Sequence, residues 1–255
     1  DSCSGNIVPA DSVAPAKRVY TTIRVTNSPV IDGKLDDPCW QSGEWQSNYT
    51  QFSPVYNGKA SLATDLKILY NDKSIFVAIR AHDNVKQITR KLGRRDHFDG
   101  DIVGVHFDSY FDHRTAFEFD ITSAGQKLDL WVSNDGWDTN WNAVWEGKVA
   151  YEDSAWTAEM EIPLSQLRYS ASPEQVWGLN SWRKIDRFQE ENHWKLVAND
   201  GTGLVYTFGE LHGLTGLKKG KRIELTPYLS GKVTTSKRIN GHPWATGSEW
   251  KGEGG

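Results

Sequence analysis

The first residues that could do chemistry alternate with apolar ones along stretches expected to form strands. In DIVGVHFD, Val103, Val105 and Phe107 are expected on one face, so His106 points to the other. The same alternation places these further residues on that second face: Glu118, Asp120, Trp131, Asn180, Trp182 and Lys184. Aromatic rings stack on a pyranose while acids and amides bind its hydroxyls, so the pattern predicts a sugar-binding face. The alternative is the outer layer of a β-sandwich, with Trp182 under a loop or second domain.

A second candidate is the segment NDGWDTNWNAVW, residues 134–145. It spaces three tryptophans four residues apart, Trp137, Trp141 and Trp145, among the oxygen-bearing residues Asp135, Asp138 and Asn140. Closely spaced oxygens in a glycine-containing loop suit calcium, and the tryptophans could form a stacking wall. The competing interpretation is a loop whose tryptophans pack on the end of the sandwich.

The usual signatures of catalysis are missing from the sequence. Glu159 and Glu161 share a face of a predicted strand, but beside Met160 and Ile162 they are expected on its solvent side. The seven histidines show no HxH or HExxH spacing, and no GxSxG occurs. We therefore expect no enzymatic activity from this domain alone.

Composition limits the class of protein. The chain has 255 residues, with 29 basic and 33 acidic side chains and no basic block, which argues against nucleic-acid binding. Twelve tryptophans, nine tyrosines and nine phenylalanines suit both β-structure and aromatic platforms for ligands. The first residues lack the layout of a signal peptide, so a mature form is expected. Cys3 and Cys39 form either a single disulfide, in an oxidising compartment, or two free thiols.

The elements that must position these residues are short strands. Period-two alternation separated by Asp, Asn and Gly recurs in these stretches: 64–72, 74–83, 101–109, 114–122, 127–133, 154–167 and 176–186. In 127–133 the alternation places Leu128, Leu130 and Val132 on the core side. Short helical turns are expected only near 36–41 and 163–167. The sequence predicts an all-β antiparallel sandwich of jelly-roll or immunoglobulin-like layers with very little helix.

The domain organisation follows from changes in composition. Residues 1–19 read as a tail or linker, 20–217 as the sandwich, and 218–255 as a Gly-rich extension with a basic start.

The stretch VIDGKLDDPCW, residues 30–40, resembles the N-terminal signature of family 9 carbohydrate-binding modules and related DOMON-type sandwiches. In physical terms, Asp32 and Gly33 make a tight turn, and Pro38 starts a short turn that delivers Trp40 as a lid on the sandwich. The resemblance continues through LKILYNDKSIFVAIRAHD, AWTAEMEIPLSQL, WGLNSWRKIDR and TFGELHGL, which extends it from about Thr21 to Leu217.

Three further stretches, residues 94–125, WTAEMEIPLSQLRY and ELTPYLSG, are similar to a bacterial family of largely unknown function. In that family such a module precedes an outer-membrane β-barrel domain. The resemblance implies a periplasmic or outer-membrane location in a Gram-negative bacterium, with the signal peptide removed. It also implies that IELTPYLSGKVTT starts the barrel and that this barrel or another outer-membrane protein is a partner.

In family 9 modules a sugar lies between two tryptophans, and the resemblance places this site only in part. The first tryptophan position falls near His97 and Phe98, and the segment Asp200 to Val205, where the second should lie, contains none. Gly104 stands where the family has a carboxylate.

The family also implies structural calcium. RRDHFDGD carries Asp96, Asp99 and Asp101 as oxygen ligands, although the spacing differs from an EF-hand. Arg94 and Arg95 offer the alternative of ion pairs with those acids.

Three functional hypotheses follow. The first is a non-catalytic carbohydrate-binding domain on the periplasmic side of the outer membrane, which recognises or handles a polysaccharide or oligosaccharide. The second is a structural or protein-interaction module without sugar affinity. The third is part of a glycoside hydrolase system, which is suggested only because family 9 modules are often attached to glycanases.

Overall fold

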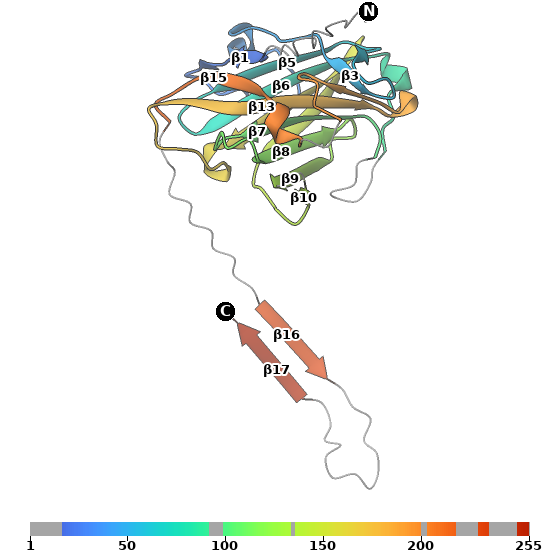
Figure 1. Ribbon diagram of the computed structural model, residues 1–255. Coiled ribbons are helices and arrows are strands. Elements are labelled where there is room, and N and C mark those ends of the chain that lie inside the picture. Colours follow the sequence, from blue (N-terminus) through green and yellow to red (C-terminus); the bar gives the residue numbers. More distant parts are fainter. Residues whose placement is uncertain are drawn as a thin grey trace, which may run out of the picture. The chain divides into compact units, whose positions relative to one another are not determined.

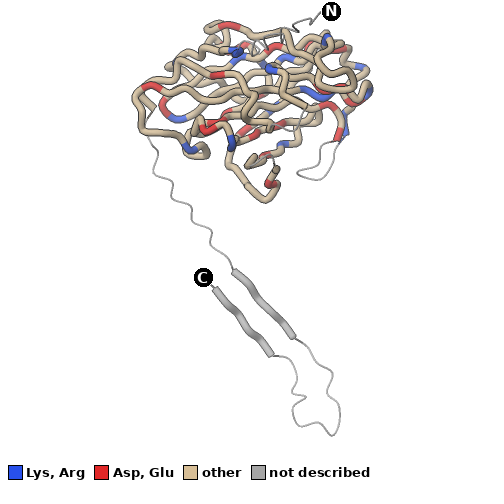
Figure 2. Tube along the Cα trace, in the orientation of Figure 1, with Lys and Arg blue, Asp and Glu red and all other residues tan. Residues whose placement is uncertain are grey.

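The computed structural model describes residues 17–91, 99–133, 136–199 and 203–217, and the backbone of 229–234 and 249–254. The chain divides into two units, Asp1–Gly220 and Lys221–Gly255. In the second unit, β16 (Leu229–Thr234) pairs antiparallel with β17 (Glu249–Gly254). The first unit holds two sheets (Figure 1). Acidic and basic residues are interspersed along its described part (Figure 2).

The larger sheet, called the ten-stranded sheet, carries the residues of interest. Its main order is β10-β9-β8-β7-β13-β14-β3-β4, and β15 joins β13 to β1. The bounds are β1 Val19–Thr21, β3 Thr50–Ser53, β4 Gly58–Lys59, β7 Ile102–Asp108, β8 Thr115–Thr122, β9 Lys127–Ser133, β10 Gly136–Asp138, β13 Glu174–Ile185, β14 Glu190–His193 and β15 Gly209–Thr215. All its pairings are antiparallel except that of β1 with β15.

The smaller, five-stranded sheet has the order β11-β12-β6-β5-β2. Its strands are β2 Ile23–Arg24, β5 Thr64–Tyr70, β6 Ser74–His82, β11 Glu146–Glu152 and β12 Ala155–Pro163. The described helices are all short 3-10 turns: η1 Pro38–Gln41, η2 Val85–Gln87, η3 Leu164–Gln166, η4 Asp186–Phe188 and η5 Val205–Thr207. The predicted all-β sandwich with very little helix is confirmed.

The main core lies between the two sheets. Alternate residues of β7 and β8, among them Val105 and Phe119, pack against Ile68 and Val77 of the five-stranded sheet. Burying each such side chain contributes on the order of 2 kcal/mol, which favours this pairing of faces. The opposite face of β7 and β8 is therefore left to His106, Glu118 and Asp120, as the sequence predicts.

Strand β9 has the opposite orientation from the predicted one. Leu130 pairs with Glu118, and Leu128 pairs with Asp120, so both leucines lie on the outer face. Trp131 pairs with Phe117 and lies on the inner side, 37% exposed at the rim. Its predicted place on the outer face is wrong. The apolar set of β9 is buried on the outer face, where Val132 packs in a second apolar cluster with Val205 and Phe208, so alternation alone does not say which side of the sheet it faces.

The N-terminal segment covers the outer face of the five-stranded sheet. Trp40 is buried there with Leu35, Leu69 and Phe76, which makes it the lid that the sequence predicts. Gly33 has φ +90°, and a Cβ on it would lie 2.5 Å from the carbonyl carbon of Val149. Only glycine fits this close turn.

Glu159 corrects another expectation, because this carboxylate is fully buried beneath that segment rather than solvent-exposed. Its Oε1 accepts a hydrogen bond from Trp40 Nε1 at 2.8 Å, and its Oε2 accepts from the backbone N–H groups of Asp32 and Gly33 at 3.0 Å each. Burial raises the pKa of Glu159, and these donors act in the opposite direction. The turn at Asp32 and Gly33 thus binds a carboxylate that lies far along the chain.

Candidate functional site

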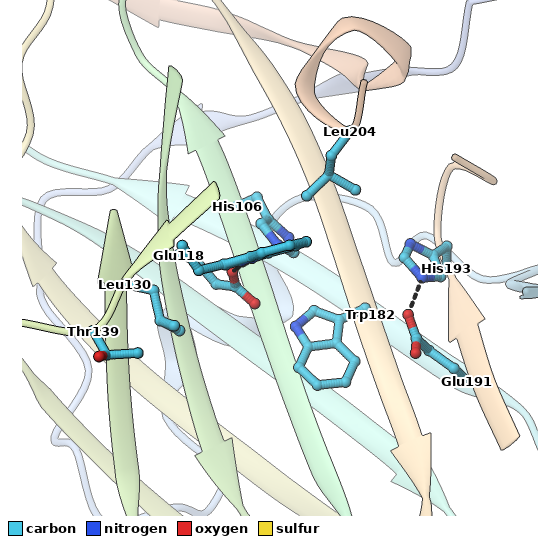
Figure 3. Close-up of a pocket in the computed structure, with 9 residues that line it drawn as sticks. His106, Glu118, Leu130, Thr139, Trp182, Glu191, His193 and Leu204 are labelled. Carbon is cyan, nitrogen blue, oxygen red and sulfur yellow. Dashed lines mark hydrogen bonds and ion pairs between the residues drawn. The ribbon is translucent and has the colours of Figure 1, made fainter. Parts of the chain in front are cut away.

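A cavity of about 360 Å³ lies on the outer face of the ten-stranded sheet (Figure 3). Its apolar and aromatic lining consists of Leu130, Trp137, Trp182 and Leu204. Its polar lining consists of His106, Glu118, Thr139, Glu191 and His193. The outer-face residues of β7, β8 and β13 form its floor, and β10, β14 and the segment before η5 supply its walls.

The first row across the floor is built around a glycine. The strand register places Asp120, Gly104 and Trp182 side by side on β8, β7 and β13. Trp182 Nε1 donates to Asp120 Oδ1 at 2.9 Å, directly above Gly104. A Cβ on residue 104 would lie 1.7 Å from Asp120 Oδ1 and 2.5 Å from Trp182 Nε1. Gly104 therefore permits an indole–carboxyl bond that spans a whole strand.

The second row joins Glu118 to His106. His106 Nε2 lies 3.2 Å from Glu118 Oε2, and the same oxygen accepts a hydrogen bond from Trp137 Nε1 at 3.2 Å. This bond ties Trp137 to the floor, although the residue is 55% exposed. Phe208 packs against the His106 ring at 5.2 Å between ring centroids and closes the other side of the row.

The two neighbouring carboxyls on β8 have different proton affinities. Burial, and then the nearby Glu118 charge, raise the pKa of Asp120 well above its usual range. Burial acts on Glu118 in the same direction, but His106 and further hydrogen-bond donors outweigh it and lower the pKa of Glu118. Glu118 is thus the ionised member of the pair, and a protonated Asp120 can share its proton with it.

Asn180 stands behind the pocket rather than in it. It is fully buried, and its side chain holds Lys195 through two bonds: Nδ2 donates to the Lys195 carbonyl at 3.0 Å, and Oδ1 accepts from the Lys195 N–H at 2.9 Å. Its Nδ2 also lies 3.3 Å from His193 Nδ1. Asn180 therefore positions a wall residue and is not part of the described lining.

Two pocket residues that sequence reasoning missed form the far wall. His193 Nε2 lies 2.6 Å from Glu191 Oε1, and the register pairs His193 with Trp182. Their only sequence signal is the alternation in EENH, where Glu190 and Asn192 point inward and are buried. Leu130, Thr139 and Leu204 were missed as well, two of them because they lie on connecting segments.

The remaining predicted ligand residues divide as follows. His106, Glu118, Trp137 and Trp182 meet at the pocket. Trp141 does not, because it packs on Phe117 and Phe119 with ring centroids 5.1 and 5.6 Å apart. Trp131 lies on the opposite face of its strand. His97 and Phe98 lie outside the described residues.

The calcium candidates are not brought together where the structure describes them. Asp101 Oδ1 accepts the Asp186 N–H at 2.7 Å, while Asp99 is exposed. Asp138 Oδ1 accepts both the backbone and the side-chain N–H of Asn140, which makes a self-contained turn. Within the described ranges no three His, Cys, Asp or Glu side chains could hold a metal together. Asp96 and Asp135 lie outside the described residues, so the calcium sites stay a prediction.

Solved structures define the class of fold. Two structures of a family 9 carbohydrate-binding module from Caldicellulosiruptor kristjanssonii match with TM-scores of 0.58 and 0.56, each at 16% identity. The match to the first structure, a complex with cellotriose, covers 82% of this chain and 100% of the module. The match to the second, a complex with glucose, covers 81% of this chain and 99% of the module. No curated protein matches the chain in sequence. The first unit thus has the β-sandwich fold of a carbohydrate-binding module.

A family profile described as "Carbohydrate family 9 binding domain-like" matches residues 31–219. The chain belongs to this family. The match includes every described residue of the pocket.

Among the described residues, no helix has the length and apolar character that crossing a membrane requires.

Proposed function

We propose that the pocket on the ten-stranded sheet binds a sugar ring of a glycan without cleaving it. The observation that carries this proposal is the juxtaposition of Trp182 and Trp137 with two carboxylates in one cavity of about 360 Å³. That volume suits one or two sugar rings. Family membership and the pocket chemistry support the proposal together.

Each part of the lining has a task in sugar binding. The Trp182 indole, which Asp120 holds at the floor, offers a ring face for stacking against a pyranose. Leu130 and Leu204 extend the apolar surface, while Glu118 and Glu191 accept hydrogen bonds from hydroxyl groups. The pocket therefore has the mixture of apolar walls and few polar groups that orients a small ligand.

The carboxyl geometry favours binding over hydrolysis. Glycosidases place two carboxyls on opposite sides of the bond that they cleave, about 5 to 9.5 Å apart. Here Glu118 and Asp120 are neighbours on one strand face, and Asp120 is already bonded to Trp182. Glu191 is engaged by His193.

Calorimetric titration of the 255-residue chain with cellotriose and related oligosaccharides tests the proposal. Cellotriose is the first ligand because the module from Caldicellulosiruptor kristjanssonii with this fold was solved in complex with it. Replacing Trp182 by Ala should weaken binding at least about fivefold, since stacking of a sugar on one indole contributes on the order of 1 kcal/mol or more.

The matched control is Trp131→Ala, which removes an equal ring from the opposite face of β9. It should leave affinity within about twofold. Binding that survives Trp182→Ala refutes the pocket as the site. A folded protein that binds none of a broad glycan set refutes the proposed function and favours an interaction module.

The periplasmic or outer-membrane setting is part of the proposal and rests on the resemblance of the sequence to a bacterial family. Cell fractionation of the native bacterium tests it. Recovery of the protein in the cytoplasm contradicts it.

A further inference from the structure

The polar groups of the pocket form two histidine–carboxylate pairs. Figure 3 shows Trp182 between them, with His106 and Glu118 to one side and His193 and Glu191 to the other. The first pair comes from β7 and β8 and the second from β14. A ligand stacked on Trp182 therefore has a carboxylate at both of its edges.

Carboxylates supply the hydrogen-bond acceptors that this lining offers a ligand. The described lining residues include two glutamates and neither lysine nor arginine. One carboxylate has about four acceptor sites, so the bonds from His106 and Trp137 and the shared proton of Asp120 leave about one site on Glu118. The side chain of Glu191 is 35% exposed, and its contact with His193 uses Oε1.

This environment distinguishes an ammonium group from a hydroxyl. A hydroxyl donates one neutral hydrogen bond, whereas an ammonium donates charge-assisted bonds that are roughly twice as strong. An indole face within about 6 Å attracts a cation further through its quadrupole. Trp182 and Trp137 supply such faces next to Glu191 and Glu118.

We propose that this pocket selects a sugar residue that carries a free amino group, with its ammonium held between the Trp182 indole and the Glu191 carboxylate. The inference rests on the proposed function and narrows its ligand class. By the same electrostatics, a uronic acid or sulfated sugar is repelled by both glutamates, and N-acetylation removes the charge that the pocket recognises.

The experiment compares four oligosaccharides of equal length on the 255-residue chain at neutral pH and low salt. These are a β-1,4-linked glucosamine oligomer, its N-acetylated form, a cello-oligosaccharide and an oligouronide. The glucosamine oligomer should bind about tenfold more tightly than the cello-oligosaccharide, and the oligouronide most weakly. Added salt should reduce the preference, because screening weakens charge interactions at a partly exposed site.

Glu191→Gln isolates the charge, since glutamine keeps the shape and one acceptor oxygen. The preference for the amino sugar should fall below about threefold while the cello-oligosaccharide still binds. The matched control is Glu174→Gln, which removes the same charge from the exposed end of β13, about 25 Å along the strand from Trp182. It should leave the preference unchanged.

The outcomes separate the two proposals. Equal or tighter binding of the cello-oligosaccharide overturns the amino-sugar inference and leaves the proposed function standing. A preference that persists in Glu191→Gln also overturns the inference, because the recognising charge then lies elsewhere. If none of the four binds, the proposed function fails and the inference fails with it.

Discussion

Each outer face of the sandwich holds a buried glutamate, but different kinds of hydrogen-bond donor bind the two carboxylates. On the five-stranded sheet, Glu159 receives N–H donors from Trp40 and from the backbone of Asp32 and Gly33. On the ten-stranded sheet, Glu118 receives donors from the side chains of His106 and Trp137 beside a cavity.

The kind of donor determines whether the carboxylate is covered by another segment of the chain. A backbone segment that donates to a carboxylate must lie over it, and here it brings apolar side chains that exclude water. Side-chain donors from strands of the same sheet hold Glu118 beside a cavity instead of beneath a covering segment. The first arrangement stabilises the fold, and the second leaves a place for a ligand.

The largest expected effect separates the two glutamates by stability. Glu159→Gln sets an amide NH₂ against either the Trp40 N–H or the two backbone N–H groups, so buried donors face each other. We expect the free energy of unfolding to fall by about 3 kcal/mol. Glu118→Gln can keep its carbonyl oxygen toward both donors and should cost less than about 1 kcal/mol. Urea denaturation measures both, and equal losses would contradict the contrast drawn between the faces.

A smaller effect tests the row that spans β7. Gly104→Ala places a methyl group against Asp120 Oδ1 and Trp182 Nε1, so the bond between them must break or shift. We expect a loss of about 2 kcal/mol of stability and at least about tenfold weaker glycan binding.

Gly136→Ala is its control. A Cβ on this residue would lie 3.4 Å from its nearest neighbour, the Ser133 carbonyl oxygen, which is an ordinary van der Waals contact. This variant should retain both stability and binding. Undiminished binding by Gly104→Ala would show that the placement of Trp182 does not depend on the glycine.

The smallest effect is a difference in pH dependence. Because the pKa of Asp120 is raised on folding, mainly by burial, its contribution to stability is complete below the pKa of an unfolded aspartate, about 4, and is lost as the pH rises through the folded pKa. Asp120→Asn imitates the protonated form and removes this dependence. Wild type should therefore lose stability relative to the variant as the pH rises above about 4. Thermal melts across pH measure the difference, and parallel curves would show that Asp120 is ionised in the folded protein.

Sequence reasoning succeeded where one face of a strand is apolar and the other polar. His106 and Glu118 were placed on the correct face because Val105 and Phe119 alternate with them. It failed for Trp131, since the apolar residues of β9 pack in a second cluster on the outer face instead of in the main core.

It also failed for Glu159, because the segment that buries this residue lies more than a hundred positions earlier in the chain. No local pattern reports such a contact. The length of a strand decided which of these pocket residues the sequence could predict. Trp182 belongs to a long alternating strand, whereas Glu191 and His193 lie on four-residue β14, too short for alternation to stand out.

Strand β13 gives the pocket a rigid base. On its inner side, Ser181 Oγ donates to the Gly104 carbonyl at 2.7 Å, and Arg183 is buried in bonds to Asp83 and to two backbone carbonyls. The residues before and after Trp182 are therefore anchored in the interior. The Trp182 indole is therefore already in the position in which it would contact a ligand. Little conformational entropy of the protein is lost on complex formation, and the floor of the pocket should superimpose between the bound and the free protein.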